Sequence, residues 1–165
     1  MTYFNAPFNY PLNIVCFHTS TETSKKNASS VVKPQSTASL AGNHSSTIDT
    51  STGIITLPNT QCMLIGTINY LSTVNYNYAR YRWYDTTNSQ YIGSIGQIRG
   101  PDANRHNAYI SNPISCDEEA VAIAQNINVK LVITAVSANN TITLDSDYLN
   151  YQRFSGKTKL IVFEF

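Results

Sequence analysis

The feature that most constrains the fold of this chain is a polar turn followed by two stretches of strand-forming residues. The turn spans residues 49–53 and ends at Gly53, a β-branched and apolar stretch follows at 54–58, and a longer apolar segment occupies 62–70. A polar turn that ends in glycine, next to residues of high β propensity, predicts a hairpin. We expect this hairpin to lead into a central strand of a β-sandwich.

Alternation of side chains predicts further strands. Residues 12–19 place Ile14, Cys16 and His18 on one face of a strand, and Val15 and Phe17 on the other. Two strands are expected within 62–84, joined near 71–75. A turn at 85–89 should lead into a paired strand at 90–93. The remaining strands are expected at 120–125, 129–136, 141–144 and 159–165. We interpret 20–46 as a surface excursion with one or two short edge strands, and 96–113 as a loop long enough to be functional. Because no stretch has sustained helical periodicity, the chain is predicted to be an all-β antiparallel sandwich.

The carboxyl-terminal residues 160–165 carry apolar side chains on both faces of the expected strand. A strand of this kind normally lies in the middle of a sheet, where the core covers one of its sides. We expect a partner to cover the other side, so the pattern implies a subunit interface.

Composition narrows the class of protein. The 165 residues suit one compact domain. We place this domain at residues 13–165, after an extended amino-terminal arm at 1–12 that is rich in aromatic residues and proline.

The net charge of +1 argues against nucleic acid as a partner, because phosphate binding needs clustered Lys and Arg. The amino terminus lacks the pattern of a secretory signal, and no stretch reaches the length of a membrane span. We therefore expect a protein made in the cytoplasm, with no membrane partner.

The titratable residues form no recognisable catalytic or metal-binding pattern. Asp145 and Asp147 have the spacing of a carboxylate pair on one strand face, but the same segment also describes a turn. The three histidines are scattered, and the three cysteines lack the paired spacing of zinc ligands, so we interpret the cysteines as buried reduced thiols. We predict that the protein is not an enzyme and has no cofactor and no metal, with calcium near Asp102 left open.

Two segments are candidates for recognition. Arg80 and Arg82 share a strand face with two tyrosines, and this ladder is internal packing, a subunit contact or a ligand platform. The loop after it combines polar groups with an aromatic residue, a composition that suits recognition of sugars or proteins. The surface-recognition candidates in it are Arg99, Asp102, Arg105, His106, Asn107 and Tyr109.

Three segments resemble, in order, the complement globular-head domain and its tumour-necrosis-factor relatives. Residues 43–58 contain an acidic residue, a Thr-Gly pair and an apolar strand, residues 128–133 stand where that family has a late core strand, and residues 154–160 resemble its closing Phe-Ser-Gly motif. The resemblance covers residues 13–165 and implies a jelly roll that assembles as a homotrimer around a three-fold axis. The trimer-interface candidates are Tyr70, Tyr81, Trp83, Phe163 and Phe165.

The chain departs from the secreted members of that family by lacking a collagen-like repeat and by being rich in Asn and Tyr. Similar trimeric jelly rolls occur in bacteriophage virions, and residues 80–85 resemble such proteins. The resemblance therefore implies a structural protein of the virion surface, either a capsid decoration (cement) protein or a head-fibre protein, bound to the major capsid protein or another virion protein. The alternative is a receptor-binding knob of a tail fibre or baseplate that recognises a host-surface glycan.

Aromatic side chains in a short terminal arm need another protein surface to cover them. We therefore expect the arm to bind the capsid, and its anchoring candidates are Tyr3, Phe4, Phe8 and Tyr10.

Overall fold

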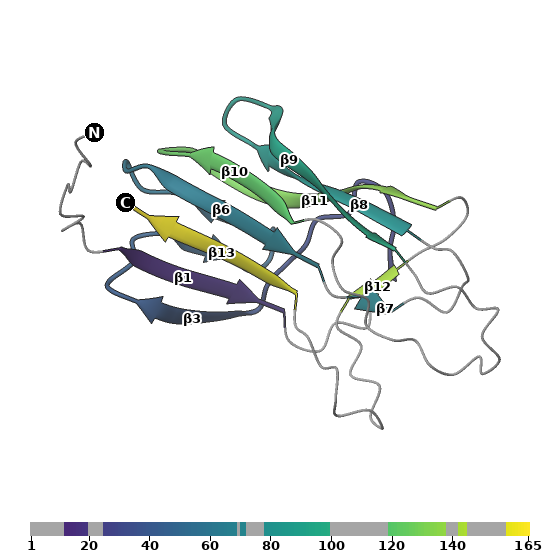
Figure 1. Ribbon diagram of the computed structural model, residues 1–165, viewed down its shortest axis with the longest axis horizontal. Helices are drawn as coiled ribbons and strands as arrows, with labels where there is room; N and C mark the ends of the chain where they lie inside the picture. The colour runs from purple at the N-terminus through teal and green to yellow at the C-terminus, as the bar shows by residue number, and fades with distance from the viewer. Residues whose placement is uncertain are drawn as a thin grey trace, which may run out of the picture.

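The structure is a computed structural model that describes residues 12–19, 25–68, 70–71, 78–99, 119–137, 142–144 and 158–165. Every regular element in these ranges is a β-strand, and all the strand pairs are antiparallel (Figure 1). Within the same ranges there is no helix of the length and apolarity that crossing a membrane requires. The prediction of an all-β antiparallel protein is confirmed.

The first sheet contains the carboxyl-terminal strand at its centre. Its order is β10-β6-β13-β1-β3, and its strands are β1 (Asn13–His18), β3 (Ser36–Ala41), β6 (Cys62–Thr67), β10 (Ala120–Ala124) and β13 (Lys159–Glu164). Figure 1 shows β13, in yellow, lying between β1 and β6. The predicted central position of the carboxyl-terminal strand is therefore confirmed.

The second sheet packs against the first and has the order β4-β5-β11-β8-β9. Its strands are β4 (Thr47–Asp49), β5 (Ile54–Thr56), β8 (Tyr78–Asp85), β9 (Gln90–Arg99) and β11 (Asn128–Val136). A small third sheet joins β2 (Lys25–Lys26), β12 (Ile142–Leu144) and β7 (Tyr70–Leu71) in the order β2-β12-β7. In the predicted surface excursion, β3 is an edge strand, as the polar composition of that segment indicates.

The β4–β5 hairpin forms where the turn residues predict it. The Asp49 carboxylate accepts hydrogen bonds from the backbone N–H of Ser51 (2.8 Å) and the hydroxyl of Thr52 (2.8 Å). Gly53 has a φ of 75° and donates its N–H to the Asp49 carbonyl (2.7 Å), a conformation that glycine adopts without strain. The chain then crosses to the opposite sheet as β6, an interior strand, so the predicted route into the sandwich is confirmed.

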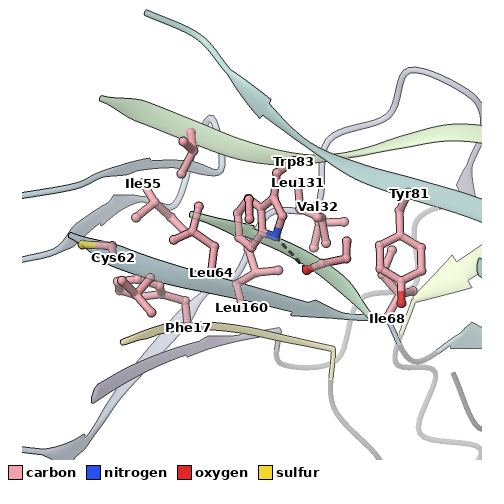
Figure 2. Packing of buried hydrophobic residues seen from close by; sticks show 14 of the residues in the cluster. Phe17, Val32, Ile55, Cys62, Leu64, Ile68, Tyr81, Trp83, Leu131 and Leu160 are labelled. Carbon is pink, nitrogen blue, oxygen red and sulfur yellow. Dashed lines mark hydrogen bonds between the residues drawn. The ribbon is translucent and has the colours of Figure 1, made fainter. Parts of the chain in front are cut away.

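The hydrophobic core lies between the two large sheets. Phe17, Leu64 and Leu160 extend into it from the first sheet, and Trp83 and Leu131 face them from the second (Figure 2). The indole Nε1–H of Trp83 donates a hydrogen bond to the Ala120 carbonyl (2.9 Å), which ties the two sheets together at the centre of the core. Close packing of this kind accounts for most of the stability of a sandwich.

Strand β9 is longer than the sequence predicts. The strand was expected to end at residue 93 and the loop to begin at residue 96, yet β9 runs on to Arg99. A β-bulge opposite Arg82 and Trp83 absorbs an irregular stretch that contains Gly93, whose φ is 69°. A side chain at Gly96 would overlap the ring of Tyr81. These glycines therefore serve the bulge and the packing of an aromatic ring, whereas in the sequence they resemble loop residues.

Candidate functional site

The two large sheets turn outward faces of opposite character. We call the outward face of β10, β6, β13, β1 and β3 the apolar face and define it below by its cross-strand rows. We call the outward face of β11, β8 and β9 the basic aromatic face, which consists of Tyr78, Arg80, Arg82, Tyr84, Tyr91 and Lys130.

Two rows of apolar side chains cross the whole first sheet. Strand register aligns one row as Val121, Ile65, Ile161, Cys16 and Ala38. It aligns the next row as Ile123, Met63, Phe163, Ile14 and Ala41. At the usual strand spacing each row is about 19 Å long, and neither row contains a charged side chain. A continuous apolar surface of this size marks an interaction site more often than it occurs by chance on a monomer.

The apolar face is open to solvent at its edge and at the carboxyl terminus. Ile123 is 57% exposed and Phe165 is 51% exposed. A polar row bounds the face at one end, where Lys159 aligns with Thr67 on one side and with His18 on the other. The hydroxyl of Thr67 donates a hydrogen bond to the Glu119 carboxylate (3.0 Å). An apolar centre with a polar margin is the usual arrangement of a protein interface.

The two described cysteines are free and buried, as the sequence interpretation predicts for them. Cys16 lies within the first apolar row, and burial raises the pKa of its thiol although the charge of Lys159 opposes the shift. Burial also raises the pKa of Cys62. Both thiols therefore act as apolar packing groups.

The basic aromatic face is held together by contacts between cations and rings. The guanidinium of Arg80 lies 5.7 Å from the ring centroid of Tyr78, that of Arg82 lies 6.0 Å from Tyr91, and the ammonium of Lys130 lies 5.4 Å from the ring centroid of Tyr84. Tyr84 and Tyr91 meet edge to face at a centroid distance of 5.1 Å. Three adjacent strands thus contribute to one connected surface of cations and rings.

Hydrogen bonds fix the two guanidinium groups on this face. Arg82 donates its Nε–H to the carbonyl of Gly93 (2.9 Å), at the bulge of β9. Arg80 donates its Nε–H to the side chain of Gln97 (2.8 Å), also on β9. A bond through Nε orients the guanidinium plane without using the edge that Nη1 and Nη2 form, which is an edge that binds carboxylate and sulfate groups in a bidentate way.

The two described carboxylates in the strands of the second sheet do not belong to the basic aromatic face. Asp85, at the end of β8, points to the core side and is 2% exposed. Burial alone would raise the pKa of Asp85, but hydrogen bonds from Asn88 and Thr87 outweigh it and lower the pKa. Asp49 lies on the edge strand β4, where hydrogen bonds from Ser51 and Thr52 lower its pKa to about 2. Both carboxylates are thus engaged in their own turns.

The structure divides the predicted trimer-interface residues into three groups. Phe163 lies in the second apolar row, and Phe165 follows it on the same side. Tyr81 and Trp83 are fully buried inside a single chain, so the prediction that they contact another subunit is wrong. Their side of β8 faces the opposite sheet and not the solvent. Tyr70 is in β7, and its side chain lies outside the described residues.

The surface-recognition prediction falls mostly outside the described residues. Arg99 is the last residue of β9, a strand position and not the loop position that was expected. The remaining members lie outside the described ranges; they are Asp102, Arg105, His106, Asn107 and Tyr109. The anchoring candidates of the arm also lie outside them; they are Tyr3, Phe4, Phe8 and Tyr10.

The catalytic and metal-binding alternatives gain no support from the described side chains. Asp145 and Asp147 lie outside the described residues. His18 and His44 place their Nδ1 atoms near backbone carbonyls, those of Thr19 (3.4 Å) and Ser46 (3.0 Å) respectively. Across the described ranges there is no cluster of three or more His, Cys, Asp or Glu side chains that suits a metal ion.

Sequence reasoning missed the residues that other strands add to each face. Val121 and Ile123 alternate with the alanines of β10, and this alternation was a usable signal. Their alignment with Ile161 and Phe163, respectively, depends on β6 lying between β10 and β13, which no local pattern specifies. Tyr91 and Lys130 join the arginine ladder in the same way, through neighbouring strands.

Comparison with known proteins identifies the fold. No family model and no curated protein sequence matches this chain. Among solved structures, the chain is similar to the Eiger TNF of S. frugiperda, with a TM-score of 0.58 and 14% sequence identity over 94% of each chain. A likeness at this identity establishes the fold, which is a jelly-roll sandwich of the tumour-necrosis-factor type.

Proposed function

We propose that this protein is a homotrimeric, non-enzymatic structural subunit that assembles through its apolar face. The observation that carries the proposal is the pair of apolar rows that cross all five strands of the first sheet. β13 lies in the middle of that sheet, so Ile161 and Phe163 are at the centre of the contact. Assembly around a three-fold axis is the arrangement that the jelly-roll resemblance implies.

The gain in free energy comes from apolar area that the single chain leaves in water. Full burial of one large apolar side chain contributes about 1.5 to 3 kcal/mol. Ile123 and Phe165 are each more than half exposed in the single chain, and the partly buried side chains of both rows add to them, except Cys16, which is already buried. In a closed ring every copy makes this contact twice, which favours a stable oligomer.

Charge substitution on the apolar face tests the assembly. Ile123→Lys places an ammonium group in the contact, and we expect the mass measured by light scattering to fall from three times the 18.3 kDa subunit mass to the subunit mass. Ile95→Lys is the matched control, since Ile95 is an isoleucine with 45% exposure on the other sheet. A wild-type protein that remains monomeric at high micromolar concentration would refute the proposal.

We propose further that the trimer belongs to the surface of a bacteriophage virion, as a capsid decoration or head-fibre protein held by the arm at residues 1–12. This step is supported by the resemblance of residues 80–85 to such proteins and by the aromatic content of the arm. The proposed partner is the major capsid protein or another virion protein.

Removal of the aromatic side chains from the arm tests the attachment. We expect a variant with serine in place of Tyr3, Phe4, Phe8 and Tyr10 to remain a trimer but to stop co-sedimenting with empty capsids of the parent particle. Wild-type protein and Ile95→Lys, which leaves the sequence of the arm unchanged, provide the controls. Undiminished co-sedimentation of the arm variant would rule out anchoring by these side chains.

A receptor-binding knob that recognises a host-surface glycan is the second candidate function. The observation that favours it is the basic aromatic face, because tyrosines and cations on a rigid sheet suit contacts with sugars. Binding of the purified protein to host cells, in an experiment without capsids, would support the receptor-binding function over capsid decoration.

A further inference from the structure

We propose that the basic aromatic face binds an acidic saccharide, a sugar chain that bears carboxylate or sulfate groups. The inference deepens the second candidate function by naming the surface and the ligand class, and it does not depend on the trimer. The apolar face belongs to the other sheet, so failure of either proposal leaves the other standing.

Charge selects the ligand class. Arg80 and Arg82 on β8 lie beside Lys130 on the adjacent strand β11, and the described residues of β8, β9 and β11 place no carboxylate on the same face. Asp85 is turned toward the core. Arg80 and Arg82 are two residues apart on β8, which puts their Cα atoms about 7 Å apart along the strand. Such a row presents repeated positive charge to an extended anionic chain.

Fixed geometry favours specific binding over loose attraction. Both guanidinium groups are oriented by Nε–H bonds to β9, at Gly93 (2.9 Å) and Gln97 (2.8 Å). The guanidinium of Arg82 lies over the ring of Tyr91, which is 45% exposed. A ligand can therefore contact the tyrosine ring as well as the guanidinium of Arg82. Because these side chains are already ordered by one another, less conformational entropy is lost when a ligand binds.

The tyrosines favour a saccharide over other anions. Tyr84 and Tyr91 meet edge to face, so they offer apolar ring surface beside a charged group. A pyranose ring has an apolar face as well as polar substituents, and an amphipathic tyrosine platform suits both. A nucleic acid would need a broad basic surface, whereas the whole chain has a net charge of only +1.

Direct binding to defined oligosaccharides tests the inference. The full-length protein is titrated with a heparin-derived oligosaccharide, with a neutral dextran oligosaccharide and with single-stranded DNA of equal length. We expect binding to the heparin fragment that weakens as salt rises, and no binding to dextran. Absence of binding to the heparin fragment at low salt, or equally tight or tighter binding of the DNA, would overturn the proposal.

Single substitutions assign the binding to this face. Arg80→Gln and Lys130→Gln should each weaken heparin-fragment binding by roughly tenfold, the usual cost of losing one charge-assisted contact. Lys159→Gln removes the same charge from the opposite sheet and should leave the affinity unchanged. Each variant is checked for an unchanged emission spectrum of the buried Trp83. An affinity that is unaffected by both Arg80→Gln and Lys130→Gln, or that falls equally in Lys159→Gln, would overturn the assignment.

Discussion

At the scale of single residues, Glu164 shows how a buried charge is accommodated near the chain terminus. Its carboxylate is 3% exposed and accepts hydrogen bonds from the backbone N–H groups of Ser45 (3.0 and 2.9 Å) and Ser46 (2.7 Å), and from the hydroxyl of Ser46 (2.6 Å). Burial alone would raise the pKa of Glu164, but these hydrogen bonds, with a smaller contribution from His44, outweigh it and lower the pKa. The crossover segment at 43–46 is thereby fixed to β13.

This carboxylate makes stability depend on pH in a defined direction. Because the pKa is lower in the folded state than the ordinary value of 4.5, the stabilisation is complete above that value and is lost as pH falls through the folded-state pKa. Glu164→Gln should lower the free energy of unfolding by about 1 to 3 kcal/mol at pH 7, with a smaller difference at pH 3.

Urea unfolding of the two proteins at both pH values measures the effect. Glu119→Gln is the control, since Glu119 is exposed and makes its described hydrogen bond with Thr67. If the Glu164→Gln and wild-type proteins differed equally at pH 3 and pH 7, ionisation of Glu164 would not contribute to stability.

At the scale of elements, β8 separates two kinds of chemistry on one strand. Ala79, Tyr81, Trp83 and Asp85 point inward, while Tyr78, Arg80, Arg82 and Tyr84 point outward. The alternation was readable from the sequence because successive side chains in a strand take opposite sides. The inward assignment of Tyr81 and Trp83 was not, because both residue types also occur at interfaces.

The position of Trp83 makes β8 sensitive to substitution on its inward side. Trp83→Phe removes the donor to the Ala120 carbonyl and leaves a cavity beside Leu131, and we expect a loss of about 2 to 4 kcal/mol in the free energy of unfolding. Chemical denaturation followed by circular dichroism measures the loss. Tyr84→Phe, on the outward side of the same strand, should change the stability by less than about 1 kcal/mol. Equal effects of the two substitutions would contradict the assignment of the two sides.

At the scale of the whole molecule, the two proposed tasks fall on separate outward faces of the sandwich. The apolar face suits assembly with copies of the chain, and the basic aromatic face remains available for a ligand because it lies on the other sheet. The net charge of +1 is a sum over the whole chain, so it is compatible with a local concentration of cations on one face.

Assembly through the apolar face should make thermal stability depend on protein concentration. Because an oligomer of folded chains is favoured by mass action, the Tm of the wild-type protein should rise as concentration rises. Ile123→Lys should remove this dependence, and Ile95→Lys should keep it. Differential scanning calorimetry over a hundredfold range of concentration measures the shift, and a constant Tm for the wild-type protein would contradict self-association.

The sequence by itself determined the local features of this protein. The alternation of Val15 and Phe17 with their neighbours predicted β1 and the two sets of side chains on its faces, and the turn ending at Gly53 predicted the β4–β5 hairpin. The apolar residues 160–165 predicted a strand in the middle of a sheet, and β13 has that position. These features depend on neighbouring residues, whose side-chain period and turn chemistry act over a few positions.

Only the tertiary structure decided which residues from distant segments share a face. Ile123 lies in one row with Phe163 because β6 pairs with both β10 and β13, and Lys130 meets Tyr84 because β11 pairs with β8. Trp83 is buried because the opposite sheet covers its side of β8. The same alternation of side chains along β8 would also fit a strand whose Trp83 side contacts another subunit. Pairing between strands far apart in the chain is set by the packing of the whole core, and the period-2 pattern of one strand does not contain that information.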